Sequence, residues 1–251
     1  AVPLLPGQEA ITRPLIPLAD GTLLINAPSE PSVGLALQAE VPSADRIDLL
    51  CAFIKWSGLR LLQPVLAQHL EAGRPLRVLT TVYLGATDRK ALDWLVERGA
   101  QVRVSTDTRR TRLHAKAWLF HRASGSSTAY IGSSNLSAPA LLDGLEWNVR
   151  LAALETPAML RKFEGTFEAY WEEGEFEPYA ATPEQRDRLD HQLSLARGVD
   201  PAAAAGSGAF TAPVWFDLRP YAYQREMLDA LAAERSLHQR WRNLVVAATG
   251  T

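Results

Sequence analysis

The sequence has 251 residues, of which 47% are hydrophobic and 22% charged, and its formal net charge is −2. This composition excludes a disordered or collagen-like chain, and no run approaches the roughly 18 apolar residues that a membrane-spanning helix needs. The start of the chain, Ala1–Arg13, lacks the order of a secretory signal, and a single cysteine, Cys51, cannot form an internal disulfide. We therefore expect a cytoplasmic protein with no membrane partner, in which Cys51 is a buried and inert thiol.

Short apolar runs alternate with helical patterns from Asp45 onward, which is the order of α/β units. The expected strands cover residues 47–54, 76–84, 101–105, 113–121, 128–132 and 145–154. The expected helices are one with Leu59, Leu62, Leu66 and Leu70 on one face, one over 88–98, a long one that opens at Thr156, and a further helical stretch that ends near Arg197. Pro64 lies inside the first helix and predicts a late start or a kink there. The strands 113–121 and 128–132 flank a short turn and predict a hairpin.

The expected fold class is α/β, with a mixed β-sheet flanked by helices in a domain that covers residues 1–197. Residues 198–212 are rich in Ala, Gly and Pro and nearly uncharged, which indicates a linker. Residues 213–251 have a different character, because an amphipathic helix is followed there by an apolar run that ends in Ala248-Thr249-Gly250-Thr251.

The expected strand 113–121 carries two residues suited to phosphate chemistry. His114 and Lys116 are two residues apart, and in a strand two such side chains lie on the same face of the sheet. A lysine supplies positive charge for a phosphate, and an imidazole can attack phosphorus or transfer a proton near neutral pH.

A second polar motif, Gly132-Ser133-Ser134-Asn135, follows the hairpin, and Glu146 comes eleven residues after Asn135. Small residues let the backbone and short polar side chains approach phosphate oxygens closely. A carboxylate beside an imidazole fixes its tautomer and stabilises its protonated form, so Glu146 is the candidate that orients His114.

The joint order of HxK, GSxN and a later acid resembles the phospholipase D-like superfamily. The resemblance implies a metal-independent phosphodiesterase in which one histidine attacks phosphorus to give a phosphohistidine while a second histidine protonates the leaving oxygen. It assigns His114 as the nucleophile, Lys116 and Asn135 as phosphate ligands, Ser133 as a supporting donor, and Glu146 as the acid of the nuclease branch. It implies no metal and no cofactor for this domain.

The chain departs from the family pattern at two points. His121 stands where the pattern has Asp, which removes a structural carboxylate and leaves Glu146 as the only motif acid. The sequence holds one HxK, whereas the family site uses two copies of the motif. We therefore expect one phospholipase D-like half per chain and a homodimer that joins two half-sites.

Residues 213–251 resemble the start of the ATPase domain of superfamily 2 helicases. Gln224 matches the residue that reads adenine, and Thr249, Gly250 and Thr251 match the first half of the phosphate-binding loop. The resemblance implies that ATP and Mg²⁺ serve only a full-length helicase and that this piece, without the lysine of the loop, hydrolyses no ATP.

A phosphodiesterase joined to a helicase is expected to cleave nucleic acid, with DNA favoured over RNA. Basic residues close to the HxK motif, Arg109, Arg110 and Arg112, offer contacts to a nucleic-acid backbone. Two other interpretations stay open. One is a nucleic-acid-binding module whose cleavage is weakened by His121. The other is a lipid or phosphatidyl-transfer enzyme, for which the chain lacks a membrane-facing segment.

Overall fold

The computed structural model describes residues 13–107, 113–198 and 222–238 of the chain. The chain divides into two compact units, Ala1–Ala209 and Phe210–Thr251. In the second unit the structure describes helix α8, Ala222–His238. No helix in the described ranges is long and apolar enough to cross a lipid bilayer.

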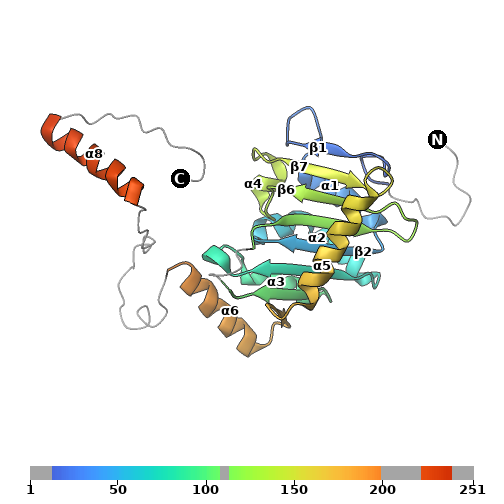
Figure 1. The fold of residues 1–251 in the computed structure, drawn as a ribbon. Coiled ribbons are helices and arrows are strands. Elements are labelled where there is room, and N and C mark those ends of the chain that lie inside the picture. Colours follow the sequence, from blue (N-terminus) through green and yellow to red (C-terminus); the bar gives the residue numbers. More distant parts are fainter. Residues whose placement is uncertain (1–12, 108–112, 199–221, 239–251) are drawn as a thin grey trace, which may run out of the picture. The chain divides into compact units, whose positions relative to one another are not determined.

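One eight-stranded sheet organises the first unit, in the order β1-β7-β6-β5-β2-β3-β4-β8 (Figure 1). Its strands are β1 (Thr22–Leu24), β2 (Arg46–Cys51), β3 (Leu76–Thr81), β4 (Gln101–Ser105), β5 (Lys116–His121), β6 (Thr128–Gly132), β7 (Asn148–Ala152) and β8 (Phe176–Tyr179). The strands β2, β3 and β4 run parallel, and the other neighbouring pairs are antiparallel. The sheet is therefore mixed, as the sequence predicts.

Helices cover both faces of this sheet. They are α1 (Val33–Glu40), α2 (Trp56–Glu71), α3 (Arg89–Glu97), α4 (Ala138–Leu142), α5 (Pro157–Glu172) and α6 (Pro183–Ala196), with 3₁₀ turns η1 (Val41–Ser43) and η2 (Tyr83–Gly85). In Figure 1, α5 crosses one face of the sheet, while α1, α2 and α3 lie on the other. The main hydrophobic core fills the face of α1, α2 and α3, and two smaller clusters lie under α5.

Alternation along β5 explains how one strand serves both faces. Trp118 and Phe120 join the main core, whereas Leu119 packs beneath α5 against Leu160. The strand β2 likewise sends alternate side chains into the cores of both faces. An uninterrupted apolar strand is what a sheet covered on both sides requires.

The structure confirms the expected strands 101–105 and 128–132 and the hairpin that β5 forms with β6. However, β5 begins at Lys116, so His114 precedes the strand. The strand β3 ends at Thr81 instead of reaching residue 84, because Leu84 takes a left-handed conformation with φ 58° that a strand does not permit.

The helix α2 begins at Trp56 and includes Pro64, so the expected late start is wrong. Pro64 is exposed, and therefore water can reach the backbone group that the proline leaves without an intrahelical partner. The buried side chains Leu59, Leu62 and Leu66 hold the helix on the sheet on both sides of the proline.

Four elements have no counterpart among the expected ones, namely β1, α1, α4 and β8. The two strands lie at the edges of the sheet and have three and four residues, too few to show a clear alternation. They form by pairing with β7 and β4, respectively.

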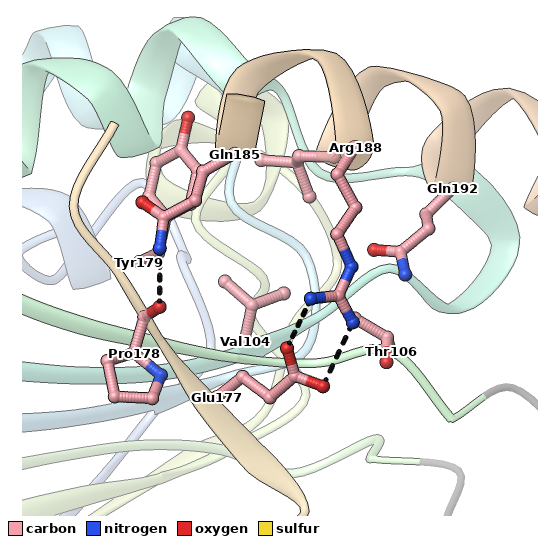
Figure 2. A pocket seen from close by; sticks show the side chains of 9 residues that line it. Val104, Thr106, Glu177, Pro178, Tyr179, Gln185, Arg188 and Gln192 are labelled. Carbon is pink, nitrogen blue, oxygen red and sulfur yellow. Dashed lines mark hydrogen bonds and ion pairs between the residues drawn. The ribbon is translucent and has the colours of Figure 1, made fainter. Parts of the chain in front are cut away.

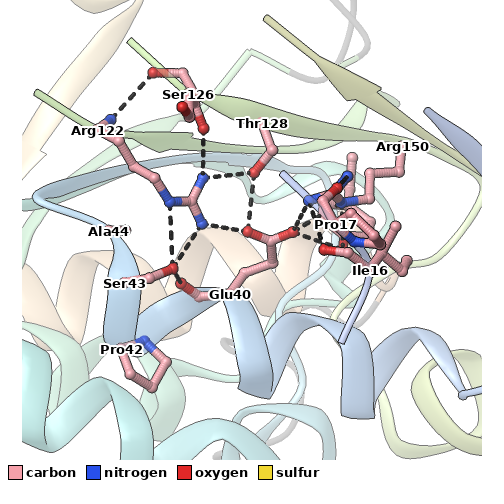
Figure 3. A network of polar contacts seen from close by, with 12 residues as sticks. Ile16, Pro17, Glu40, Pro42, Ser43, Ala44, Arg122, Ser126, Thr128 and Arg150 are labelled. Carbon is pink, nitrogen blue, oxygen red and sulfur yellow. Dashed lines mark hydrogen bonds and ion pairs between the residues drawn. The ribbon is translucent and has the colours of Figure 1, made fainter. Parts of the chain in front are cut away.

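A buried ionic network ties α1 to β5, β6 and β7 (Figure 3). The carboxylate of Glu40 is fully buried, contacts Arg122, and lies 2.7 Å from Nη2 of Arg150. The hydroxyl groups of Thr128 and Tyr130 each donate to it at 3.0 Å. Arg150 also donates to backbone carbonyls of the segment before β1. Because the buried charges are paired and hydrogen-bonded, their desolvation cost is offset.

The strand β8 and the helix α6 close the β4 edge of the sheet. Arg188 of α6 binds both carboxylate oxygens of Glu177 at 2.8 and 3.0 Å, and Gln185 donates to the carbonyl of Pro178 at 3.1 Å (Figure 2). The hollow between these two elements has about 40 Å³, which is room for about one water molecule and not for a substrate.

Candidate active site

The five predicted catalytic residues lie at one end of neighbouring strands of the sheet. The strand β2 ends where β5 begins, and β6 ends where β7 begins. The HxK motif lies at the start of β5, the loop 133–137 follows β6, and Glu146 precedes β7. In an antiparallel pair, one strand ends where its neighbour begins, so these segments meet at the same end of the strands. The structure thus brings together His114, Lys116, Ser133, Asn135 and Glu146.

His114 and Lys116 are in direct contact. The Nζ atom of Lys116 lies 2.9 Å from Nδ1 of His114 and donates to the main-chain oxygen of His114 at 2.6 Å. The imidazole is exposed, whereas Lys116 is only 5% exposed. A buried ammonium group therefore anchors a histidine that solvent and substrate can reach.

The charge of Lys116 differs from the other buried charges that the structure describes. The other buried carboxylates and guanidinium groups in the described residues, those of Glu40, Asp48, Asp93, Arg122 and Arg150, all take part in salt bridges. In the same part of the chain, Lys116 is buried without a salt bridge. A buried cation without a counter-ion costs free energy, and an anion bound from outside would offset that cost.

Loss of hydration lowers the pKa of both members of this pair, partly for the exposed imidazole and more fully for the buried ammonium group. For His114, desolvation is the larger cause, and the positive charge of Lys116 adds to it, so the pKa lies below the ordinary value of 6.5. Burial also lowers the pKa of Lys116, against the opposing effects of Cys51 and Glu146. The lowered pKa favours the neutral form of the imidazole, which is the form that acts as a nucleophile.

Glu146 contacts Ser133 and not the imidazole that it was predicted to orient. The hydroxyl group of Ser133 donates to the carboxylate of Glu146 and accepts from the backbone N–H of Trp147 at 3.0 Å. The carboxylate acts on Lys116 through its charge. In this structure Glu146 therefore positions the serine, and none of its described hydrogen bonds reaches His114.

The loop 133–137 holds the amide group of Asn135 in the site. The Oδ1 atom of Asn135 is buried and lacks a hydrogen-bond partner among the described residues. Leu136 donates to the carbonyl of Phe53 at 3.1 Å and accepts from the N–H of Lys55 at 2.8 Å. Gly58 of α2 packs so closely on the loop that a Cβ atom there would lie 2.3 Å from the carbonyl carbon of Leu136. The backbone of the loop is therefore held in place by these contacts.

Phe53 belongs to the site although the sequence did not single it out. Its ring stands edge-on to the imidazole of His114, with 6.0 Å between the ring centroids, and Nζ of Lys116 lies 5.8 Å from its centroid. Tyr83 stacks behind Phe53 at 6.4 Å. Its position in the sequence could have indicated this, because Phe53 follows the carboxyl end of a parallel strand, where ligand sites of α/β sheets lie.

His121, which stands where the family pattern has Asp, lies at the opposite end of β5 from the HxK motif. Its Nε2 atom is 2.6 Å from the carboxylate of Asp48 on β2, which also binds Arg77 at 2.7 Å. Asp48 is 1% exposed. Asp48 of the neighbouring strand thus supplies a carboxylate at this position. The replacement of the family's Asp by His121 therefore affects a structural cluster at the end of β5 that is farther from His114.

Cys51 is buried, as predicted, and lies opposite Lys116 in the pairing of β2 with β5. Burial raises the pKa of its thiol to about 11. The remaining predicted residues, Arg109, Arg110, Arg112, Thr249, Gly250 and Thr251, lie outside the described residues, as does the side chain of Gln224 in α8.

A mixed sheet flanked by helices, with HxK and GSxN meeting at one edge, defines a phospholipase D-like domain. Residues 43–171, just over half of the chain, match the family described as "Cardiolipin synthase, PLD-like domain". This chain belongs to the phospholipase D-like family. The matched range contains all five predicted catalytic residues.

Several solved structures resemble the chain. Nuc, a phospholipase D family member from Salmonella typhimurium, is 16% identical with a TM-score of 0.48 over 64% of this chain and 99% of that one. NucT from Helicobacter pylori is 14% identical with a TM-score of 0.48 over the same shares. Phosphatidylserine synthase from Haemophilus influenzae is 12% identical with a TM-score of 0.43 over 71% of this chain and 46% of that one. No protein with a curated description matches the sequence.

Proposed function

We propose that the chain is a metal-independent phosphodiesterase that hydrolyses nucleic acid through His114. The observation that carries the proposal is the buried ammonium group of Lys116, which has no salt bridge in the described structure and lies 2.9 Å from the imidazole. A substrate phosphate that pairs with this ammonium group brings its phosphorus next to a neutral imidazole. The amide nitrogen of Asn135 is the group of this side chain that would donate to a further phosphate oxygen.

The proposed reaction has two displacements at phosphorus. In the first, a ring nitrogen of His114 forms a bond to phosphorus, the bond to the leaving oxygen breaks, and the imidazolium of a second His114 gives that oxygen its proton. In the second, water attacks phosphorus, gives a proton to the second ring, and breaks the bond between nitrogen and phosphorus. Both rings are thereby restored. Lys116 and Asn135 balance the negative charge on the phosphoryl oxygens.

The second histidine is proposed to come from another copy of the chain. The sequence holds one HxK, and apolar side chains are exposed beside the site: Ile131 by 38%, Val149 by 44%, Trp147 by 68% and Leu145 by 99%. A groove of about 350 Å³ between α5 and the sheet reaches Ala115, the residue between His114 and Lys116. A twofold contact across this apolar face would bring two half-sites together.

The choice of nucleic acid as substrate rests on the sequence of residues 213–251. This segment resembles the start of a helicase ATPase domain, and we propose that it continues into such a domain in a longer protein. A phosphodiesterase carried by a helicase meets nucleic acid, and DNA is the substrate that we favour.

Cleavage of a DNA oligonucleotide in the presence of a chelator tests the mechanism. The wild-type chain should cleave, and the variant His114→Ala should not, while the exposed His191→Ala should cleave as wild type. A phosphorylated histidine should be trapped by rapid alkaline quenching. Cleavage that depends on a divalent ion would overturn the mechanism.

The dimeric site has its own test in the variant Met159→Glu. Met159 is 59% exposed and lines the apolar groove, so a carboxylate there should yield a monomer that does not cleave. Leu195→Glu on α6, where the leucine is 52% exposed, is the matched control and should stay dimeric and active. Sedimentation that shows a stable wild-type monomer with cleavage activity would contradict the shared site.

A second candidate function is phosphatidyl transfer, because the description of the matching family names cardiolipin synthase. The same displacements would then end with an alcohol instead of water as the acceptor. Vesicles of phosphatidylglycerol provide the test: a lipid product without oligonucleotide cleavage would replace the nucleic-acid assignment. Oligonucleotide binding without turnover of either substrate would indicate a binding module.

A further inference from the structure

We propose that a groove beside the active site, lined by Trp56, Lys90 and Arg197, binds single-stranded nucleic acid leading into the catalytic centre. The inference rests on the proposed function and narrows it, because it names a single strand as the substrate. The groove has about 480 Å³ and lies between the start of α2, the start of α3 and the end of α6.

The aromatic member of this groove is Trp56, the first residue of α2. Its indole is half-buried, and Nζ of Lys90 lies 4.2 Å from the ring centroid. Lys90 is exposed and has no carboxylate partner among the described residues. The ammonium group is therefore held by the ring alone, and it can move onto a phosphate while the indole face takes a base.

The charges that line the groove leave a positive excess. Asp88 is paired with Lys55 at 3.2 Å, and Asp190 is paired with Arg89 at 2.8 Å. These ion pairs neutralise the two carboxylates of the lining. In the described part of the chain Lys90 and Arg197 form no salt bridge, and Arg197 is exposed. A net positive groove on a chain whose net charge is −2 provides the local attraction that a polyanion needs.

A short series of contacts links the residues of the groove to those of the active site. Phe53 contacts His114 on one side and stacks on Tyr83 on the other. Two residues beyond Tyr83, the carbonyl of Gly85 accepts a hydrogen bond from Arg197 at 2.7 Å. The backbone N–H of Asp88, whose carboxylate binds the N–H of Trp56, donates to the carbonyl of Ile54 at 2.8 Å. These contacts place Phe53 and Tyr83 between the imidazole and the segment, residues 85–88, that borders the groove.

Alternating rings and cations suit a single strand better than a duplex. In a single strand the bases are free to stack on aromatic side chains, whereas in a duplex they are stacked on one another inside the helix. No base-specific hydrogen bond is needed, so the groove would accept any sequence.

A structural role for the contact between Lys90 and Trp56 is the alternative, and the same helix offers a matched control. At the other end of α3, Arg98 lies 5.2 Å from the ring centroid of Trp94 and is paired with Glu71 at 3.2 Å. If such contacts were only structural, removing either cation would leave nucleic-acid binding unchanged.

Fluorescence anisotropy of a labelled thymidine oligonucleotide tests the groove. The measurement uses the 251-residue chain with His114→Ala, so that the probe is not consumed. In this background Trp56→Leu should weaken binding roughly tenfold, and Trp56→Phe should restore most of the loss. The variant Lys90→Gln should weaken binding and reduce the slope of log Kd against log salt concentration by about 0.7. Arg98→Gln should bind as the parent, and a duplex of the same length should bind more weakly.

Unchanged binding in both Lys90→Gln and Trp56→Leu would overturn the proposal that the groove binds a single strand. Binding of a duplex as tight as that of the single strand would also overturn it. Because Lys90 is exposed, Lys90→Gln should fold normally, so this variant still tests the proposal if Trp56→Leu lowers the melting temperature of the chain. Failure of the proposed function would appear differently, as a wild-type chain that cleaves no phosphodiester in the presence of a chelator. The anisotropy measurement does not depend on cleavage.

Discussion

Two glycines on helices should respond in opposite ways to the same substitution. Gly58 in α2 faces the loop 133–137, and an added Cβ atom would meet the carbonyl carbon of Leu136 at 2.3 Å and the nitrogen of Ser137 at 2.4 Å. Gly165 in α5 is exposed, and a Cβ atom there would meet nothing within 4 Å. Gly58→Ala should therefore destabilise the chain and displace Asn135, whereas Gly165→Ala should stabilise the chain.

The magnitudes follow from two opposing effects. Alanine in a helix is worth about 1 kcal/mol over glycine, and Gly165→Ala should gain about that much. At Gly58 the same gain is outweighed by overpacking, which costs roughly 2–3 kcal/mol because backbone has to move by about 1 Å to reach ordinary contact distance. The two variants should then differ by about 2–3 kcal/mol, or roughly 4–12 °C in melting temperature for a chain of this size.

Thermal unfolding and hydrolysis of a small chromogenic phosphodiester measure the two consequences. A displacement of about 1 Å at the phosphate site is expected to reduce kcat/KM about a hundredfold in Gly58→Ala, while Gly165→Ala keeps the parent value. If Gly58→Ala is as stable as Gly165→Ala, the close packing of α2 on the loop is refuted. If it is destabilised yet fully active, the loop does not position a catalytic group.

Three further predictions concern the buried polar groups. Glu40→Gln removes a buried charge shared by Arg122 and Arg150 and should cost about 3–5 kcal/mol in urea unfolding, while the exposed Glu172→Gln should cost almost nothing. For Asp48, burial raises the pKa, but hydrogen bonds and charges from His121 and Arg77 outweigh it and hold the pKa below its ordinary 3.8. Its stabilising effect is therefore present above that value and lost as pH falls through the lower folded pKa, so the stability difference between wild type and Asp48→Asn should be large at neutral pH and shrink below about pH 4. A constant difference at all pH values would contradict this coupling. Because burial raises the pKa of Cys51 to about 11, a thiol reagent near pH 8 should label the chain only after unfolding in urea, and rapid labelling of the native chain would show that the thiol is accessible.

Strongly patterned elements of the fold were predictable from local sequence. The runs that became β2, β4 and β6 are apolar and bounded by turn residues, and the helix α3 carries its apolar residues on one face. The edge strands β1 and β8 were not predictable, because they are short and exist through pairing with β7 and β4. The break at Leu84 also has no local signal, since a leucine rarely adopts a positive φ.

The residues that form the site were predictable from the sequence, but the contacts between them were not. The motif spacing identified His114, Lys116 and Asn135, which the fold brings to one edge of the sheet. The contact of Glu146 with Ser133 could not be read from spacing, because it depends on how β6 and β7 end. The place of Phe53 next to His114 likewise depends on the pairing of β2 with β5.

The sequence by itself determined the family, the alternation of strands and helices, and the residues able to act on a phosphate, because these follow from side-chain chemistry and short-range periodicity. Only the tertiary structure decided which buried charges are compensated. Asp48 meets His121 across two strands, and Glu40 meets two arginines from distant parts of the chain, whereas Lys116 is left without a salt bridge in the described structure. Pairing of this kind depends on contacts between residues far apart in sequence, which no local pattern records.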